Sequence, residues 1–591
     1  MDRMRIGTVS DVDPVLRTTR NSEISISKMP PEVLMQIFEE VAFCIPLDFE
    51  DLHSPVAGMV QELSSLVSVC RYWRQVSFGC ARLWSHIPAI PDTPDCVYSK
   101  LVTPFLLHSG SMPLRMSVTL LEGANSSMAA TTALLRSFAH RMQELYLVYT
   151  DHGTNDLSAS KLLEAISHPA PLLECLVIAI SDRTRFHPYS SMPVLFAGGM
   201  ANVRALALHA PRSFFPANNL GKLMHVRLSF PHLHLNEKHL IEFLRNAPQI
   251  ETLWIASTGT FDFDQLSPDL LQSVRLCRLH TASLTLDPYS AFKLLSYLDA
   301  PSCTKLHLPS LSVPLTLMGH DGLYYPVAFH RLLLEGLSRF TSTFHVTSLD
   351  IMDYRDKQHD VDCSGTHKGG HYIIADGQRC GLWMTLDPPM APRLRIRPLP
   401  NHRLQALQQS LPLRNITTAR LAFSGAHMVL LASMVASLPA LTTLVIRFPW
   451  VQAEGRDSAL AEVVEALRAV EGTEACAVPV PAPHLASLAI EFPFAVSISE
   501  LGVLVRVTAA RAQAGYPLQE LVVCAPELSE EELQPFRAHV AAVRLEGTAG
   551  ALWPLRVDDR WRIKNDYWAM YESDMFEQFP SRWCDNVSSQ G

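Results

Sequence analysis

The sequence has few charged residues and no excess of positive charge. Charged side chains make up 18% of the 591 residues, below the roughly 25% of an average soluble domain. The 58 acidic and 49 basic residues give a net charge of −9, and 48% of the residues are hydrophobic. A polybasic nucleic-acid binder and a highly charged disordered chain are therefore excluded, because the first needs a cationic field and the second needs weak hydrophobicity.

The common motifs of catalysis and cofactor binding are also missing. The chain contains no glycine-rich phosphate or dinucleotide motif, of the form G-x-x-x-x-G-K-[ST] or G-x-G-x-x-G. The hydrolase patterns G-x-S-x-G and H-E-x-x-H are absent as well. From these absences we expect no enzymatic activity and no cofactor.

The twelve cysteines form no Cys-x-x-Cys pair. Isolated cysteines in a long chain indicate a reduced, intracellular protein, in the cytoplasm, the nucleus or both. The first 27 residues lack the apolar core of a secretory signal, so we expect a flexible leader there.

One stretch, Leu421 to Ile446, has no charged side chain and is longer than the about 20 residues that span a bilayer. Pro439 divides it into a part with helical periodicity and a part with the pattern of a strand. We therefore expect a helix, a turn and a strand there, and no association with a membrane.

The segment from Met29 to Val41 predicts an amphipathic helix. Two prolines and Glu32 suit the first turn of a helix, and four apolar residues then form one predicted stripe. These four residues are Leu34, Ile37, Phe38 and Val41. A second helix is expected through Leu63, Leu66, Val67, Cys70 and Trp73, with Val69 and Val76 on a neighbouring face.

In their order and spacing these residues resemble the F-box, a module of about three helices. The matching segments are Met29-Pro30-Pro31-Glu32-Val33-Leu34, Ile37-Phe38, Leu66-Val67-Ser68-Val69-Cys70-Arg71-Tyr72-Trp73 and Leu83-Trp84. Met29 replaces the leucine usual in the family, and roughly twenty residues from Phe43 to Gln61 are inserted between the first two helices.

The resemblance implies docking onto the Skp-family adaptor of cullin ubiquitin ligases. F-box helices present apolar side chains to helices of that adaptor, which is a helix-in-groove mode of recognition. The implied adaptor-binding residues are Pro30, Glu32, Val33, Leu34, Ile37, Phe38, Leu66, Val69, Cys70, Trp73 and Trp84. The alternative for each single residue is that it only packs a small helical bundle.

The segment from Pro104 to Met116 resembles one that follows the F-box in many basidiomycete proteins, with His108 in place of the common arginine. This resemblance implies a fungal origin.

Beyond residue 130 the chain repeats a helical stretch, a turn that often contains proline, and a short leucine-rich strand. The first apolar residues of the predicted strands are Leu145, Leu176, Leu206, Val226, Leu253, Leu284, Leu306, Leu349, Leu421, Leu444, Leu488, Leu521 and Val543. The 12 intervals between positions 145 and 543 have a mean of about 33 residues and vary widely, which indicates irregular repeats. A doubly wound α/β domain is the alternative, but it would need the missing glycine-rich turn.

The sequence thus predicts an α+β protein, a small helical F-box followed by an irregular, leucine-rich-repeat-like α/β solenoid. The expected divisions are a leader at 1–27, the F-box-like domain at 28–90, a connecting segment at 91–130, the solenoid at 131–550 with a polar insertion loop at about 354–388, and an aromatic-rich cap at 551–591. Four tryptophans define the cap: Trp553, Trp561, Trp568 and Trp583.

One tract in the insertion has residues that bind zinc. Cys363, His367, His371 and Cys380 supply two thiols and two imidazoles, with His359 nearby. Gly369 and Gly370 argue against a helix that would align the two histidines, so the expectation is a polar loop without metal, and a metal-dependent activity is the rival hypothesis.

By resemblance, the function is to recruit a target protein through the solenoid to a Skp-cullin-F-box ubiquitin ligase. Neither nucleic acid nor membrane is an expected partner. The alternative is a repeat scaffold for protein–protein interaction that has no ligase partner.

Overall fold

The computed structural model describes the chain in segments. These are residues 25–43, 63–87, 95–121, 125–150, 158–180, 192–209, 215–230, 237–257, 273–312, 336–337, 344–355, 369–377, 380–387, 409, 411–422, 430–448, 463–464, 466–467, 481–492 and 494–546. The described residues belong to two compact units, unit 1 up to Leu223 and unit 2 from Met224. The leader up to residue 24 and the four tryptophans of the expected cap lie outside the described residues.

Unit 1 begins with a helical module. The 3-10 helix η1 (Ser25–Lys28) precedes α2 (Pro31–Phe43), and residues 63–69 form a helix that is followed by α4 (Arg71–Gly79). The single helix expected through Leu63 and Trp73 is wrong, because Cys70 has an extended backbone (φ −158°, ψ 173°). Its Sγ accepts a hydrogen bond from the Trp73 amide at 3.4 Å, so Cys70 caps the N-terminus of α4.

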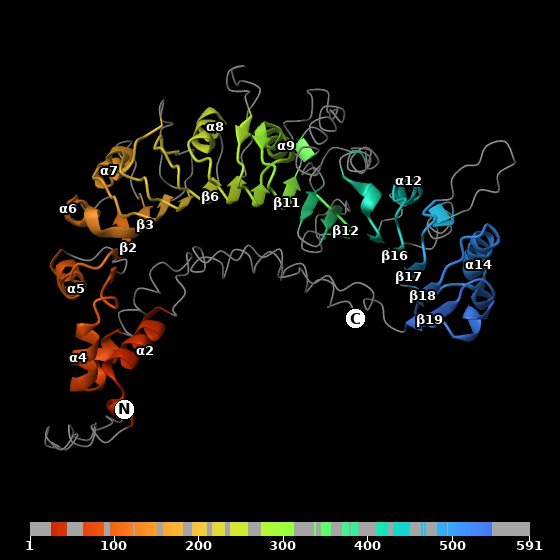
Figure 1. Cartoon of the computed structure of the whole chain (residues 1–591), viewed down its shortest axis with the longest axis horizontal. Coiled ribbons are helices and arrows are strands. Elements are labelled where there is room, and N and C mark those ends of the chain that lie inside the picture. The colour runs from red at the N-terminus through yellow and green to blue at the C-terminus, as the bar shows by residue number, and fades with distance from the viewer. Residues whose placement is uncertain are drawn as a thin grey trace, which may run out of the picture. The chain divides into compact units, whose positions relative to one another are not determined.

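A parallel sheet completes unit 1. Its strands pair in chain order and in one direction, and helices lie on one side of it (Figure 1). The strands are β1 (His86–Ile87), β2 (Leu114–Leu121), β3 (Met142–Thr150), β4 (Cys175–Ile180) and β5 (Ala205–His209). The helices are α5 (Asp95–His108), α6 (Asn125–Phe138), η2 (Ala139–Arg141), α7 (Ser158–Ala165) and η3 (Phe196–Gly198).

Unit 2 contains a longer and mostly parallel sheet. Its strands, in spatial order, are β6 (His225–Phe230), β7 (Thr252–Ser257), β9 (Thr281–Thr285), β11 (Lys305–Ser312), β14 (Gly381–Asp387), β13 (Gly369–Asp376), β12 (Ser348–Arg355), β15 (Thr418–Ala422), β16 (Thr443–Arg447), β17 (Ser487–Glu491), β18 (Glu520–Cys524) and β19 (Ala542–Glu546). Among the strands that the structure describes here, β13 alone runs antiparallel to its neighbours.

Helices connect many of these strands and, as in unit 1, lie on one side of the sheet (Figure 1). They are α8 (Glu237–Arg245), α9 (Pro288–Tyr297), η8 (Leu413–Asn415), α12 (Leu430–Ala436), α14 (Ile498–Gln513) and η11 (Glu531–Ala538). A separate two-stranded sheet pairs β8 (Val274–Arg275) with β10 (Leu298–Asp299). The chain is therefore α+β, with mixed helix and strand and a large parallel sheet.

All thirteen apolar positions of the sequence pattern fall in strands, and twelve of them are at most 1% exposed. The pattern misaligns two of them. Leu253 is paired with Ala282 and Leu444 with Ala419, so Leu284 and Leu421 lie two residues further along their strands than expected. A pattern that searches for leucine passes over alanine, although Ala282 and Ala419 are fully buried at these positions.

The polar insertion loop expected at about 354–388 is wrong for part of its length. Residues 369–376 and 381–387 are the strands β13 and β14, which enter the sheet between β11 and β12. Ile373, Ala375, Leu382 and Met384 are fully buried, which explains why this segment joins the core. Polar residues before β13 hid the alternation of buried and exposed positions in the strand pair.

The uncharged stretch from Leu421 has the expected helix, turn and strand, with α12 followed by β16. No helix within the described ranges is long and apolar enough to cross a membrane.

Candidate protein-docking surface of the helical module

Helix α2 has two apolar faces. Leu34 and Phe38 are completely buried, whereas Val33, Ile37 and Val41 are 40%, 36% and 38% exposed. The latter three follow each other at intervals of four residues and therefore lie along one side of the helix. The single stripe of Leu34, Ile37, Phe38 and Val41 predicted from the sequence is thus divided between the core and the surface.

The buried face of α2 packs on α4. The rings of Phe38 and Trp73 are 4.9 Å apart at an angle of 55°, an arrangement that is favourable for aromatic pairs. The Tyr72 hydroxyl donates a hydrogen bond to the Met29 carbonyl at 2.9 Å, just before α2 begins. These contacts fix the start and the middle of α2 against α4, so the exposed face is held in place.

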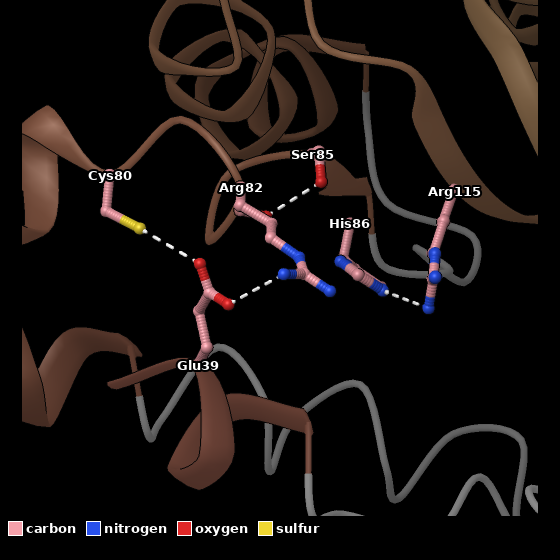
Figure 2. Close-up of polar contacts among 6 residues, drawn as sticks. All are labelled: Glu39, Cys80, Arg82, Ser85, His86 and Arg115. Carbon is pink, nitrogen blue, oxygen red and sulfur yellow. Dashed lines mark hydrogen bonds and ion pairs between the residues drawn. The ribbon is translucent and has the colours of Figure 1, made fainter. Parts of the chain in front are cut away.

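A polar contact ties the second half of α2 to the turn after α4. Figure 2 shows Glu39 between the Cys80 thiol, 3.7 Å from Oε1, and the Arg82 guanidinium, 3.0 Å from Oε2. Burial raises the pKa of the Cys80 thiol, and Glu39 adds to this shift. The thiol therefore stays protonated and donates its hydrogen bond to the carboxylate.

Trp84 lies inside the module. It is 6% exposed, its indole N–H donates to the Ser77 carbonyl at 2.8 Å, and its ring is 5.3 Å from Phe105 of α5. His108, which replaces the arginine of the resembled fungal segment, stacks on Phe78 at 4.5 Å and lies 5.0 Å from Trp84. The connecting segment is therefore packed against the module.

The structure divides the eleven predicted adaptor-binding residues into three groups. Exposed residues are Pro30, Glu32, Val33, Ile37 and Val69; partly buried residues are Cys70 and Trp73; buried residues are Leu34, Phe38, Leu66 and Trp84. The buried four stabilise the module, and the exposed five are available to a partner. Sequence reasoning did not assign Met29 and Val41 to the surface, although both are more than a third exposed.

The module is joined directly to the sheet of unit 1. His86 and Ile87, which form β1, pair with Arg115 and Met116 of β2, and the Arg115 amide also donates to the Ser85 carbonyl at 2.9 Å. Figure 2 shows the Arg115 guanidinium next to the His86 ring, 3.3 Å from Nε2. Burial, and then the charge of Arg115, lower the pKa of His86 to about 3, so the neutral imidazole accepts this hydrogen bond.

The structure does not bring the predicted zinc ligands together within the residues that it describes. Cys363, His367 and His359 lie outside the described residues. His371 is near the start of β13 and Cys380 follows its end, about 17 Å away at the strand rise of 3.4 Å per residue. These two residues cannot share one zinc ion.

Cys380 has another contact, because its Sγ accepts a hydrogen bond from the His345 amide at 3.1 Å. Burial raises the pKa of its thiol, which disfavours the thiolate that binds metal. Across the described residues, no group of three or more His, Cys, Asp or Glu side chains is arranged to hold a metal ion.

Comparison with known proteins identifies the module and little else. The F-box-like family profile matches residues 26–87, so the chain carries an F-box-like domain there. F-box domains generally bind Skp1-type adaptors, which indicates a role in protein–protein interaction. No curated protein matches the chain. The crystal structure of a Bacteroides fragilis protein aligns with 60% of this chain and with 74% of its own chain. The sequence identity is 10% and the TM-score is 0.23.

Proposed function

We propose that this chain is a substrate-recognition subunit of a Skp-cullin-F-box ubiquitin ligase. In this proposal the F-box-like domain docks on a Skp-family adaptor, and the region after it recruits the target protein. The observation that carries the proposal is the row of exposed aliphatic side chains on α2, Val33, Ile37 and Val41, within the segment that matches the F-box-like family.

This row gives α2 an exposed apolar face in addition to its buried one. Its residues lie at the i, i+4 and i+8 positions with which an amphipathic helix enters a groove of a partner. Contiguous exposed apolar side chains are rare on monomeric soluble proteins, and where they occur they often mark an interaction site. Val69, on the helix before α4, is 55% exposed and adds a second aliphatic contact of the same kind.

The region that recruits the target is proposed to be a leucine-rich-repeat-like solenoid. The supporting features are parallel strands paired in chain order, helices on one side of each sheet, and leucines buried at repeated strand positions. In a repeat architecture each unit buries its leucines against its neighbours and leaves a long second face for binding. Fungal origin is proposed only from the resemblance of residues 104–116.

We further propose that the chain performs no bond chemistry. It would act in the cytoplasm or nucleus by raising the effective concentration of the target near a ubiquitin-conjugating enzyme. The direct pairing of β1 with β2 supports this role, because it fixes the F-box-like domain relative to the unit 1 sheet.

The test is binding of a purified Skp-family adaptor to the full chain. Val33→Asp combined with Ile37→Asp places two carboxylates in the proposed interface without touching the buried Leu34 and Phe38. We expect at least a hundredfold weaker binding, because desolvating an unpaired charge is costly. Gln36→Asp, on the same helix and exposed but outside the row, is the matched control and should bind like the parent.

Circular dichroism spectra that coincide for the three proteins would show that the module stays folded. If the parent does not bind the adaptor, or the double variant binds it as well as the parent does, the docking assignment is wrong. The chain would then be a scaffold without a ligase partner. A Trp73→Ala variant is less informative, because Trp73 packs on Phe38 and its loss would also destabilise the module.

A further inference from the structure

The apolar core of unit 2 is incompletely covered at β19. On the neighbouring strand β18, Leu521 and Val523 face the core and are 1% and 0% exposed. Their register partners on β19 are Val543 and Leu545, which continue the same two rows of core positions but are partly exposed. In a repeat architecture each unit covers the leucines of the unit before it, so the last strand needs a separate cover.

The backbone of β19 is open at the same place. Its register partner is β18, from Ala542 opposite Glu520 to Glu546 opposite Cys524. Along its other edge no further strand is paired with it in the part of the chain that the structure describes. An open edge with N–H and C=O groups is a template for one more strand. This end of the sheet therefore offers backbone hydrogen bonds and an apolar surface together.

The sequence that follows β19 suits this position. Residues 547–591 lie outside the described residues, and the first four after Glu546 are Gly547-Thr548-Ala549-Gly550. Two glycines among four residues favour a tight turn. The next five residues, Ala551-Leu552-Trp553-Pro554-Leu555, carry no charge. The turn and the apolar run have the order that a hairpin with β19 requires.

We propose that residues 551–555 pair with the open edge of β19 as an antiparallel strand and cover the end of the core. Loops of four residues are common in β-hairpins. In such a hairpin Leu552 lies opposite Leu545. Pro554 lies opposite Val543, so both added side chains fall on the core side of the sheet. The partly exposed positions of β19 thereby gain apolar neighbours.

Two further residues of the run fit the same register. Trp553 falls opposite Arg544 on the outward side, where the arginine is paired with Glu520 and its side chain is 63% exposed. An indole ring is a favourable neighbour for such a guanidinium. Proline lacks a backbone N–H and is confined to edge strands, so Pro554 would prevent pairing with another strand beyond it. The segment closes the sheet and does not extend it.

The covalent connection favours this segment over a second copy of the chain or another protein. Only four residues join it to β19, and a short linker gives an effective concentration of the order of millimolar. The pairing is therefore expected at any concentration of the chain. It is independent of the proposed ligase role, because it concerns only β19 and the residues after it.

Hydrogen exchange of the full chain, followed by mass spectrometry, tests the pairing. Leu552→Asp combined with Trp553→Asp places two charges in the proposed contact. The matched control is Val587→Asp combined with Ser588→Asp, which adds the same charge later in the segment 547–591. We expect the β19 amides to exchange at least tenfold faster in the first protein and at the parental rate in the control. The β17 amides should be equally protected in all three, which shows that the sheet is folded.

Equal exchange of β19 in the parent and in the Leu552→Asp, Trp553→Asp protein would overturn the proposal. Protection of β19 that is lost on dilution of the parent would also overturn it, because a second copy would then cover the edge. If the double variant does not fold, disulfide formation replaces it. Oxidation should join the thiols of an Arg544→Cys, Trp553→Cys protein, as seen by peptide mapping, but not those of Arg544→Cys, Val587→Cys. Equal joining of the two pairs contradicts the hairpin.

Discussion

On α2, three aliphatic side chains between 36% and 40% exposed follow one side of a helix. On the sheet of unit 2, the outward positions hold Arg227, Trp254 and His307, and the imidazole is only 8% exposed. The first surface suits a partner that always offers the same apolar groove. The second contains a guanidinium stacked on the Trp254 ring and a buried, neutral imidazole. The difference shows that an exposed apolar row and a mostly covered polar line can occur in one chain, the first on a helix and the second on a sheet.

The largest effect on the free energy of unfolding is expected when the buried face of α2 loses a core side chain. Phe38→Ala empties a fully buried site that packs on Trp73 and should cost about 3–5 kcal/mol of the free energy of unfolding of the module. Urea unfolding followed by tryptophan fluorescence measures this loss. The sheet signal of unit 2 in circular dichroism should persist at urea concentrations where the module has unfolded, and a single transition would show that the module and unit 2 unfold together.

The second prediction concerns pH and the sheet. His307 has a folded-state pKa of about 4, below the 6.5 of an exposed histidine, so the unfolded chain binds the proton more readily between these values. The free energy of unfolding should therefore fall as the pH is lowered from 6.5 to 4, by up to about 3 kcal/mol at about 1.4 kcal/mol per pKa unit. Urea titrations at pH 7 and pH 4.5 should show a smaller decrease for His307→Gln than for the parent. Equal decreases would show that His307 titrates normally.

A third, smaller effect distinguishes a partly buried ion pair from an exposed one. Asp350 is 7% exposed and holds the Arg420 guanidinium by two hydrogen bonds. Burial raises the pKa of Asp350 and the arginine opposes this shift. Arg420→Ala should cost about 1–3 kcal/mol, because it leaves a buried carboxylate without its partner. Arg537→Ala breaks the exposed pair with Glu530 and should cost less than about 0.5 kcal/mol in the same unfolding assay. Equal costs would mean that Asp350 is hydrated.

The smallest effect on stability is expected at the docking surface itself. Ile37→Ser and Val69→Ser alter side chains that are 36% and 55% exposed, so each should change the free energy of unfolding by less than about 0.5 kcal/mol. Both should nevertheless weaken adaptor binding. A large loss of stability from either change would assign that residue to the core and weaken the distinction between the two regions.

The sequence predicts the strands well where the core is leucine-rich, because each buried position repeats the same residue type. It does not predict the break at Cys70, since no proline or glycine interrupts the helical pattern and the cap is made by a thiol. It likewise groups Ile37 with Leu34 and Phe38, because periodicity identifies an apolar sector of a helix but not its boundary with solvent.

The order of the motifs in the sequence identified the helical module. Only the packing in the structure distinguishes its exposed residues, which are available to a partner, from its buried ones. Trp84 belongs to the family pattern and yet packs on Phe105 inside the chain. The line of register partners Arg227, Trp254, Ser283, His307 and Trp383 on the unit 2 sheet has no signature in the sequence, since its successive members are between 24 and 76 residues apart and meet only through strand register.

Because β1 pairs with β2, the orientation of the F-box-like domain should not depend on the length of the chain between these two strands. Strand β1 ends at Ile87, and the neighbouring strand β2 begins at Leu114. The backbone hydrogen bonds between β1 and β2 fix the orientation of the F-box-like domain relative to the unit 1 sheet. The length of the chain that joins the two strands does not. An insertion between residues 88 and 94 should therefore lengthen the path without tilting the domain.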